Sequence, residues 1–157
     1  MKTKIALLLV TLSAAALGQG LTGYGFFAPG RVTPGSTGTM NFGVGADGVI
    51  GKGIGAGAEL GVLSPWDCFS ECVVGMFSPN VTYHFLRENQ RRVDPYVTAG
   101  YTLMFREGHA NLFNFGGGMN YWFARRIGFR AEFRDHVHFD SNARDHFWGF
   151  RFGLAFR

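Results

Sequence analysis

Alternation with a period of two residues runs through almost the whole chain, and this feature restricts the fold most. In the segment 111–123, "NLFNFGGGMNYWF", most odd positions hold large apolar side chains, while asparagine and glycine fill most even positions. Segments 54–62, 97–105, 127–138 and 146–157 follow the same rule. Successive side chains of a β-strand point to opposite faces, so the pattern predicts strands throughout.

The composition of the two faces indicates a barrel in a membrane. One face is rich in Phe, Tyr, Leu and Val, while the other carries Gly, Asn, Thr and a few charged residues. An exported soluble sandwich or a lipocalin-like carrier also alternates, but its solvated face is rich in charged side chains, lysine in particular. Beyond the first 18 residues this chain has a single lysine, Lys52. A closed transmembrane barrel explains both faces, because it pairs all backbone groups and turns alternate side chains to lipid.

Turn residues between the alternating runs divide the chain into eight expected strands. They are 20–28, 37–48, 53–63, 71–84, 94–105, 111–123, 127–138 and 146–156. An even number of antiparallel strands puts both chain ends on one side, which for a bacterial outer-membrane barrel is the periplasm. We therefore expect turns 49–52, 86–93 and 124–126 on that side, and loops 29–36, 64–70, 106–110 and 139–145 outside.

Residues 1–18 have the layout of a cleaved secretory signal peptide. Lys2 and Lys4 precede an apolar run from Ile5 to Leu17, and small residues end at Gly18. A retained membrane helix would need ~18–20 apolar residues. The expected domains are a signal peptide, 1–18, and an outer-membrane β-barrel domain, 19–157. Without the two lysines the net charge falls from +4 to +2, which gives no electrostatic reason to expect a nucleic-acid partner.

Several charged and amide side chains fall on the inward positions of the predicted strands. The interior of an eight-stranded barrel is just wide enough for side chains to fill it. Opposite charges there must pair, because an unpaired buried charge is expensive. We predict a lumen plugged by ion pairs, with a narrow or gated pore as the alternative. The charged set is Asp47, Glu59, Arg130, Glu132, Arg134 and Arg151, joined by Asn41, Asn80, Asn114 and Asn120.

Five motifs in order give the chain a family resemblance over residues 20–157. "GYGFFAPG", "PYVTAGY", "FNFGGGMNYWF", "GFRAEFRDH" and "FWGFRFGLAFR" resemble the outer membrane protein beta-barrel domain family, the small OmpA/OmpX-like barrels. The resemblance implies an all-β fold, an eight-stranded antiparallel up-and-down transmembrane barrel.

The last motif also resembles the C-terminal signal that the barrel-assembly machinery reads. Phe152, Leu154 and Phe156 would carry it, with Arg157 one residue beyond the usual terminal aromatic. The implied partners are that machinery and periplasmic chaperones during biogenesis, then outer-membrane lipids and lipopolysaccharide. We expect a monomer.

The cluster "RDHVHFDSNARDH", residues 134–146, is the best catalytic candidate in the chain. Some eight-stranded barrels are lipid A-modifying enzymes with a histidine, a serine and an acid at the outer rim, where a carboxylate holds the histidine that activates the serine. His138 and Ser141 are not at the H-x-S spacing that resembles the lipid A deacylases, and polar loop residues that bind lipopolysaccharide phosphates or divalent ions are a simpler explanation. Strict alternation turns Asp135 outward, so either it lies above the hydrocarbon or a β-bulge turns it inward. The candidate residues are Arg134, Asp135, His136, His138, Asp140, Ser141, Asp145 and His146.

Two further motifs have structural rather than catalytic interpretations. Cys68 and Cys72 favour a loop disulfide in an oxidising compartment, and the histidines are too distant in sequence to complete a metal site. "GVGADG", residues 43–48, matches G-x-G-x-x-G, but a dinucleotide site would need a strand followed by a helix. Inward glycines instead leave room for bulky neighbours. We expect no cofactor and no metal.

These patterns predict a small bacterial outer-membrane barrel, integral to the membrane, with both termini periplasmic. Its expected role is structural, in envelope integrity, or interactive, at the cell surface. We expect no enzymatic activity. A lipid A-modifying enzyme with a rim His/Ser/Asp site and a narrow pore are the alternatives, since the fold alone does not fix a function.

Overall fold

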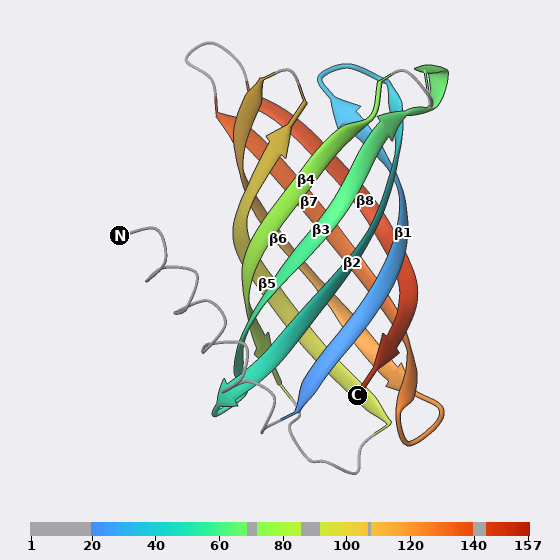
Figure 1. The fold of residues 1–157 in the computed structure, drawn as a ribbon, viewed down its shortest axis with the longest axis vertical. Coiled ribbons are helices and arrows are strands. Elements are labelled where there is room, and N and C mark those ends of the chain that lie inside the picture. Colours follow the sequence, from blue (N-terminus) through green and yellow to red (C-terminus); the bar gives the residue numbers. More distant parts are fainter. Residues whose placement is uncertain (1–19, 69–71, 86–91, 107, 140–143) are drawn as a thin grey trace, which may run out of the picture.

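The computed structural model describes residues 20–68, 72–85, 92–106, 108–139 and 144–157, and it shows a closed antiparallel barrel (Figure 1). The strands follow one another around the barrel in chain order, and β1 pairs with β8 to close it. The strands are β1 (Leu21–Thr33), β2 (Gly38–Gly51), β3 (Ile54–Pro65), β4 (Val74–His84), β5 (Val93–Phe105), β6 (His109–Trp122), β7 (Ile127–Phe139) and β8 (Arg144–Phe156). The predicted eight-stranded antiparallel barrel is therefore confirmed.

The first strand is longer than predicted. We read Pro29 and Gly30 as the start of a loop, whereas β1 continues through both to Thr33. Gly30 is needed for close packing rather than for a turn, because a Cβ there would lie 2.4 Å from the backbone oxygen of Trp148. Pro29 pairs with Met40 of β2. The ladder with β8 is interrupted near the proline, which has no backbone N–H to donate.

Several other strands also extend beyond their predicted ends. The strand β2 runs to Gly51, into the predicted turn 49–52, and β3 runs to Pro65, into the predicted loop 64–70. Phe105 pairs with His109, so β6 begins two residues earlier than predicted, and β8 begins at Arg144. By contrast, β4 begins at Val74 rather than at residue 71. The differences lie at loop ends, where local turn residues say little about how far a ladder continues.

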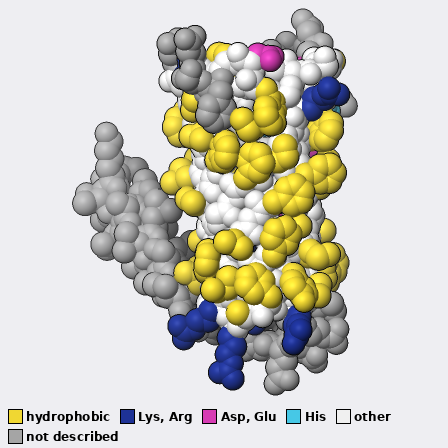
Figure 2. Space-filling model, turned by 90° about the vertical axis from the view of Figure 1, so that its right-hand side faces the viewer, with side chains coloured by type: hydrophobic (Ala, Val, Ile, Leu, Met, Phe, Trp, Pro, Cys, Tyr) yellow, Lys and Arg dark blue, Asp and Glu magenta, His cyan; other side chains and the backbone are white. Residues whose placement is uncertain are grey.

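The outer face of the barrel is apolar. Figure 2 shows hydrophobic side chains gathered in an upper and a lower band of the surface, separated by a paler zone. Many of these side chains pack against a neighbour on the next strand, as in the stacked pair Phe129–Phe152 and the edge-on pair Phe133–Phe150. None of the described residues forms a helix long and apolar enough to cross a membrane.

The inner face is filled by side chains, and inward glycines make room for them. A Cβ on Gly43 would lie 2.6 Å from the Phe26 ring, and one on Gly45 would lie 2.7 Å from the Tyr24 ring. Both glycines belong to β2, and β3 follows that strand. The G-x-G-x-x-G match therefore belongs to the wall of a barrel rather than to a strand–helix unit.

The start of β1 and the end of β8 lie side by side, at the lower end of the barrel in Figure 1. The turns at this end are basic, and most of the Lys and Arg side chains seen in Figure 2 gather there. Among the described residues at this end, the exposed basic ones are Lys52, Arg92, Arg125, Arg126 and Arg157. The predicted signal peptide, residues 1–18, lies outside the described residues.

Candidate functional site

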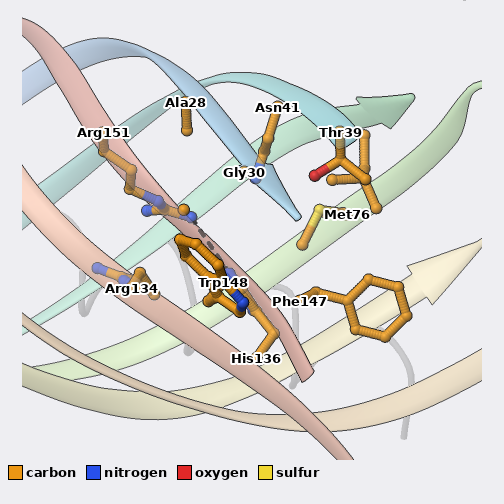
Figure 3. A pocket seen from close by; sticks show the side chains of 12 residues that line it. Ala28, Gly30, Thr39, Asn41, Met76, Arg134, His136, Phe147, Trp148 and Arg151 are labelled. Carbon is orange, nitrogen blue, oxygen red and sulfur yellow. Dashed lines mark hydrogen bonds between the residues drawn. The ribbon is translucent and has the colours of Figure 1, made fainter. Parts of the chain in front are cut away.

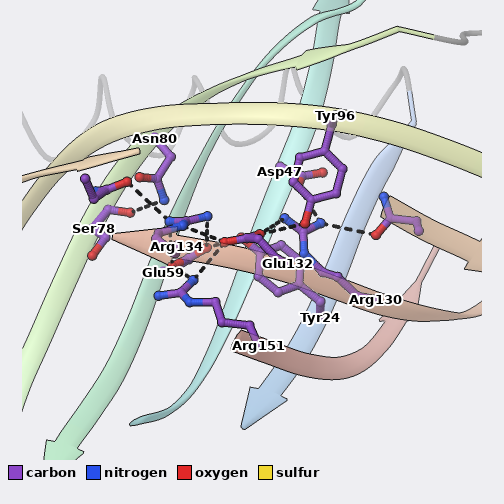
Figure 4. A network of polar contacts seen from close by, with 12 residues as sticks. Tyr24, Asp47, Glu59, Ser78, Asn80, Tyr96, Arg130, Glu132, Arg134 and Arg151 are labelled. Atoms are coloured by element: carbon purple, nitrogen blue, oxygen red, sulfur yellow. Dashed lines mark hydrogen bonds and ion pairs between the residues drawn. The ribbon is translucent and has the colours of Figure 1, made fainter. Parts of the chain in front are cut away.

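The middle of the lumen holds a network of charged side chains, shown in Figure 4. Strands β2, β3, β7 and β8 contribute them, and each residue is 1–4% exposed. The six charged side chains that alternation placed inward, Asp47, Glu59, Arg130, Glu132, Arg134 and Arg151, all belong to this lumen network.

Glu59 is the first of two carboxylates at the centre of the lumen network. Its Oε2 accepts hydrogen bonds from Nη1 of Arg151 at 2.8 Å and from Nη1 of Arg134 at 3.2 Å. Its Oε1 accepts one from the Tyr24 hydroxyl at 2.8 Å. One carboxylate from β3 thus joins side chains of β1, β7 and β8.

Glu132 is the second central carboxylate, and it binds the same kind of partners. Its Oε1 lies 2.5 Å from Nε of Arg134, and its Oε2 accepts a hydrogen bond from Nη2 of Arg130 at 3.1 Å. The Tyr96 hydroxyl donates to Oε2 at 2.6 Å. Arg151 approaches the same carboxylate at 3.5 Å, so the two carboxylates share two arginines.

Two tyrosines complete the environment of Arg130. Its guanidinium lies 3.9 Å from the ring centre of Tyr24 and 4.3 Å from that of Tyr96, which are cation–π distances. Its Nη1 also donates to Asp47 at 3.3 Å. These tyrosines were not among the predicted lumen residues, although alternation against the outward Val97 puts Tyr96 on the inner face.

The lumen network is balanced in charge and leaves little space. Three arginines pair with three carboxylates, so the positive and negative charges of the network are equal in number. The cavity beside it, shown in Figure 3, has about 20 Å³ and is lined in part by Asn41, Arg134, His136 and Arg151. A cavity of this size holds about one water molecule.

A smaller polar cluster lies between the lumen network and the basic end of the barrel. Nδ1 of His84 is 3.0 Å from the Asp94 carboxylate, which also accepts a hydrogen bond from Nδ2 of Asn120 at 3.1 Å. Oδ1 of Asn120 in turn accepts from Arg130 at 3.3 Å. Asn120 therefore links the two groups of polar side chains.

The other predicted lumen asparagines are also buried. Nδ2 of Asn114 donates to Oγ1 of Thr102 at 2.9 Å, and its Oδ1 accepts from Arg134 at 3.4 Å. Nδ2 of Asn80 donates to the backbone oxygen of Ser78 at 3.1 Å. Asn41 lines the small cavity.

The lumen section on the side away from the termini contains an apolar cluster beside buried polar side chains such as Asn41 and Thr102. Leu112 is 1% exposed and Met76 is 3% exposed, and Phe147 packs against them. We name the buried residues Leu63, Met76, Met104 and Leu112 the apolar lumen section. It contains no charged group and lies beside Asn41 and Thr102, which pair with Leu63 and Leu112 in the strand ladders.

The candidate catalytic cluster is divided between the two faces of the barrel. His136 points inward, where its Nδ1 lies 3.0 Å from Oγ1 of Thr102. Asp135 and His146 pair on the outer side, with Nδ1 of His146 at 2.7 Å from Oδ2 of Asp135. Asp140 and Ser141 lie outside the described residues.

The register settles how Asp135 turns. Asp135 pairs with Phe115 of β6 and with Trp148 of β8, and both ladders continue without a shift on either side. The β-bulge that we considered is therefore wrong, and Asp135 keeps the outward position that alternation assigns. In the part of the chain that the structure describes, no group of three or more His, Cys, Asp or Glu side chains could hold a metal ion.

The remaining predicted residues lie at the two ends of the barrel. Cys68 and Cys72 form a disulfide after β3, where the Trp66 indole donates to the backbone oxygen of Thr39 at 3.1 Å. At the other end, the three residues of the terminal motif are on the outer face of β8. These residues, Phe152, Leu154 and Phe156, are 44%, 49% and 49% exposed.

A closed eight-stranded barrel with an apolar outer face and a charged lumen has the fold of the small outer-membrane barrels. No family model matches the sequence, and no curated protein is similar to it. Among solved structures, the chain is similar to the N-terminal β-barrel domain of OprF from Pseudomonas aeruginosa, with a TM-score of 0.66 and 15% identity over 88% of this chain and 97% of that one.

Two further structures show how far this likeness reaches. Neisserial surface protein A has a TM-score of 0.62 and 13% identity, covering 87% of this chain and 94% of its own. A de novo designed transmembrane β-barrel has a TM-score of 0.56 and 14% identity, covering 86% of this chain and 93% of its own. Since a designed protein shares the fold, the likeness establishes architecture and not function.

Proposed function

We propose that the protein is an integral outer-membrane barrel of a bacterium with a two-membrane envelope, with both termini in the periplasm and no enzymatic activity. Its role is structural, in the integrity of the envelope, or interactive, through the loops at the end opposite the termini. The apolar outer face supports the membrane location, because alternate side chains of such a barrel face lipid.

The burial and ion pairing of the lumen side chains are the observation that supports a structural role rather than transport. Arg134 is 1% exposed and is held by both Glu59 and Glu132, so the charged side chains fill the cross-section. The apolar lumen section narrows the same path nearer the opposite end. An ion would have to break buried ion pairs in order to pass the network.

Conductance in a planar bilayer tests the closed lumen. The mature protein should show no steady current. Arg134→Ala, which removes the side chain between the two carboxylates, should give measurable openings, whereas Tyr121→Phe on the outer face should stay closed. Large stable channels from the unaltered protein would show that the lumen is a pore.

Heat modifiability and cell fractionation test the membrane placement. The refolded protein should migrate faster unboiled than boiled, and it should sediment with outer membranes. A tag after Arg157 should become accessible to protease only when the outer membrane is permeabilised. A tag that is digested on intact cells would place the termini outside.

The partners that we propose follow from this placement. They are the barrel-assembly machinery and periplasmic chaperones during biogenesis, then lipopolysaccharide and outer-membrane lipids around a monomer. Phe152, Leu154 and Phe156 lie together on one face of the last strand, where an assembly factor could read them. Replacing Phe156 with Asn should lower the amount of protein in the outer membrane without preventing refolding in detergent.

A further inference from the structure

The outer face has a hollow over β4, β5 and β6. Val97 and Ala99 of β5 form its floor, with Gly117 opposite Val97 in the β5–β6 ladder. Its walls are the aromatic side chains of Tyr83 on one side and of Phe115 and Phe133 on the other. The outward side chains that line this hollow are all apolar or aromatic.

Gly117 keeps the hollow open although the barrel does not need a glycine there. A Cβ at Gly117 would meet its nearest atoms, the Tyr96 oxygen and Val97 Cγ1, at 3.5 and 3.7 Å, which is ordinary contact. At the neighbouring inward glycines, Gly116 and Gly118, a Cβ would lie 2.3 Å from a backbone oxygen. Any larger residue at this outward position would fill part of the hollow, so the glycine keeps the space between the aromatic side chains open.

The hollow begins near the one lysine of the barrel. Ile54, which also lines the hollow, follows Lys52 by two residues, and the Tyr83 ring lies against the same turn, 3.4 Å from the place of a Cβ on Gly53. Lys52 has a φ of 51°, in the left-handed region that non-glycine residues seldom adopt. A lysine is thus held at this turn despite an unfavourable backbone conformation.

The charge around Lys52 suits an anion. The other exposed charged residues described at this end are the arginines 92, 125, 126 and 157. Asp94, a half-buried acidic residue at this end, binds His84 and Asn120. A phosphate at this end would meet an excess of positive charge.

We propose that the hollow and Lys52 form a binding site for one anionic phospholipid. One acyl chain lies beside Gly117 between the aromatic walls, and the phosphate binds the Lys52 ammonium. A hollow in the hydrocarbon region must be filled, because its lining atoms otherwise lose their contacts. This site depends on the membrane placement proposed above, and it assigns the lipid class that the barrel selects.

Native mass spectrometry of the refolded full-length mature protein tests the site, with phosphatidylglycerol and phosphatidylcholine of identical chains as probes. The unaltered protein should retain one phosphatidylglycerol in preference to phosphatidylcholine. Gly117→Leu should lower retention of both lipids about tenfold, the effect of roughly two methylene groups losing their buried contacts. Lys52→Asn should remove the preference for phosphatidylglycerol, and Lys52→Arg should keep it.

Gly25→Leu is the matched control, because Gly25 also faces outward and the nearest atom to a Cβ there is 3.9 Å away. It should retain lipid like the unaltered protein. If Gly117→Leu retains as much lipid as the unaltered protein, the site is wrong. A dimer that only Gly117→Leu dissociates would also overturn it, because a second copy of the chain would then fill the hollow. A heat shift recorded on every sample separates these results from failure of the membrane placement, which would remove the shift from the unaltered protein itself.

Discussion

The two sections of the lumen are held together by different interactions. In the charged network, Glu59 and Glu132 each hold more than one arginine, and each carboxylate also accepts a tyrosine hydroxyl. In the apolar lumen section, Leu112 and Met76 only fill space. Both sections are buried, but only the first depends on every partner being present.

This difference predicts how the stability of each section responds when a side chain is removed. Removal of one member of a buried ion-pair network leaves an uncompensated charge, which costs more than the pair contributes. Truncation of an aliphatic side chain costs its transfer free energy plus a cavity term, and neighbours can relax into the space. The network therefore fixes one arrangement of the lumen, whereas the apolar section tolerates substitutions of similar volume.

The largest effect is expected for Glu132→Ala. Arg134 and Arg130 would lose their shared carboxylate, so the free energy of unfolding should fall by about 3–5 kcal/mol. Urea titration in lipid vesicles, followed by the heat-shift gel, measures this change. Asp67→Ala, at an exposed position of the 3-10 helix Trp66–Cys68, should change it by less than ~0.5 kcal/mol. Equal effects of the two substitutions would contradict the network.

Leu112→Ala should come next, with a loss of about 2–4 kcal/mol from the cavity it leaves. Leu112→Met preserves the volume and should cost less than ~1.5 kcal/mol. The same urea titration compares them. If the methionine variant is as unstable as the alanine variant, the apolar lumen section does not tolerate substitutions of similar volume, and the expected difference between the two sections is wrong.

Tyr24→Phe should have an intermediate effect. The ring over Arg130 remains, but the hydroxyl that donates to Glu59 at 2.8 Å is lost, which should cost about 1–2 kcal/mol. Tyr121→Phe removes a hydroxyl from an outward residue and serves as the control. If Tyr24→Phe is as stable as the unaltered protein while Glu132→Ala is unstable, the arginines alone provide the hydrogen bonds that the carboxylates need.

The smallest effect is expected for the outer pair of Asp135 and His146. The His146 side chain is 39% exposed, so its interaction with Asp135 should contribute no more than about 1 kcal/mol. A double-mutant cycle of Asp135→Asn and His146→Gln measures it. A coupling free energy as large as that between residues of the lumen network would show that an ion pair on the outer face contributes as much stability as one inside the lumen.

Much of the barrel can be predicted from the sequence, because strand direction is a local property. The inward positions of Glu59 and Arg151 follow from counting residues along each strand. The prediction of a loop from Pro29 and Gly30 was wrong. A glycine that is required for close approach to Trp148 looks the same in the sequence as a glycine in a turn. Asp135 could not be resolved locally either, because only the paired register of β6, β7 and β8 excludes a bulge.

The sequence by itself determined the number of strands, their two faces and the six charged side chains of the lumen network, because a period of two fixes where each side chain points. Only the tertiary structure decided which of those charges meet. Glu59 and Arg151 are 92 residues apart, and their contact depends on barrel closure and on the stagger between strands. The hollow at Gly117 likewise exists only where β4, β5 and β6 lie side by side, since no single strand contains its walls and its floor.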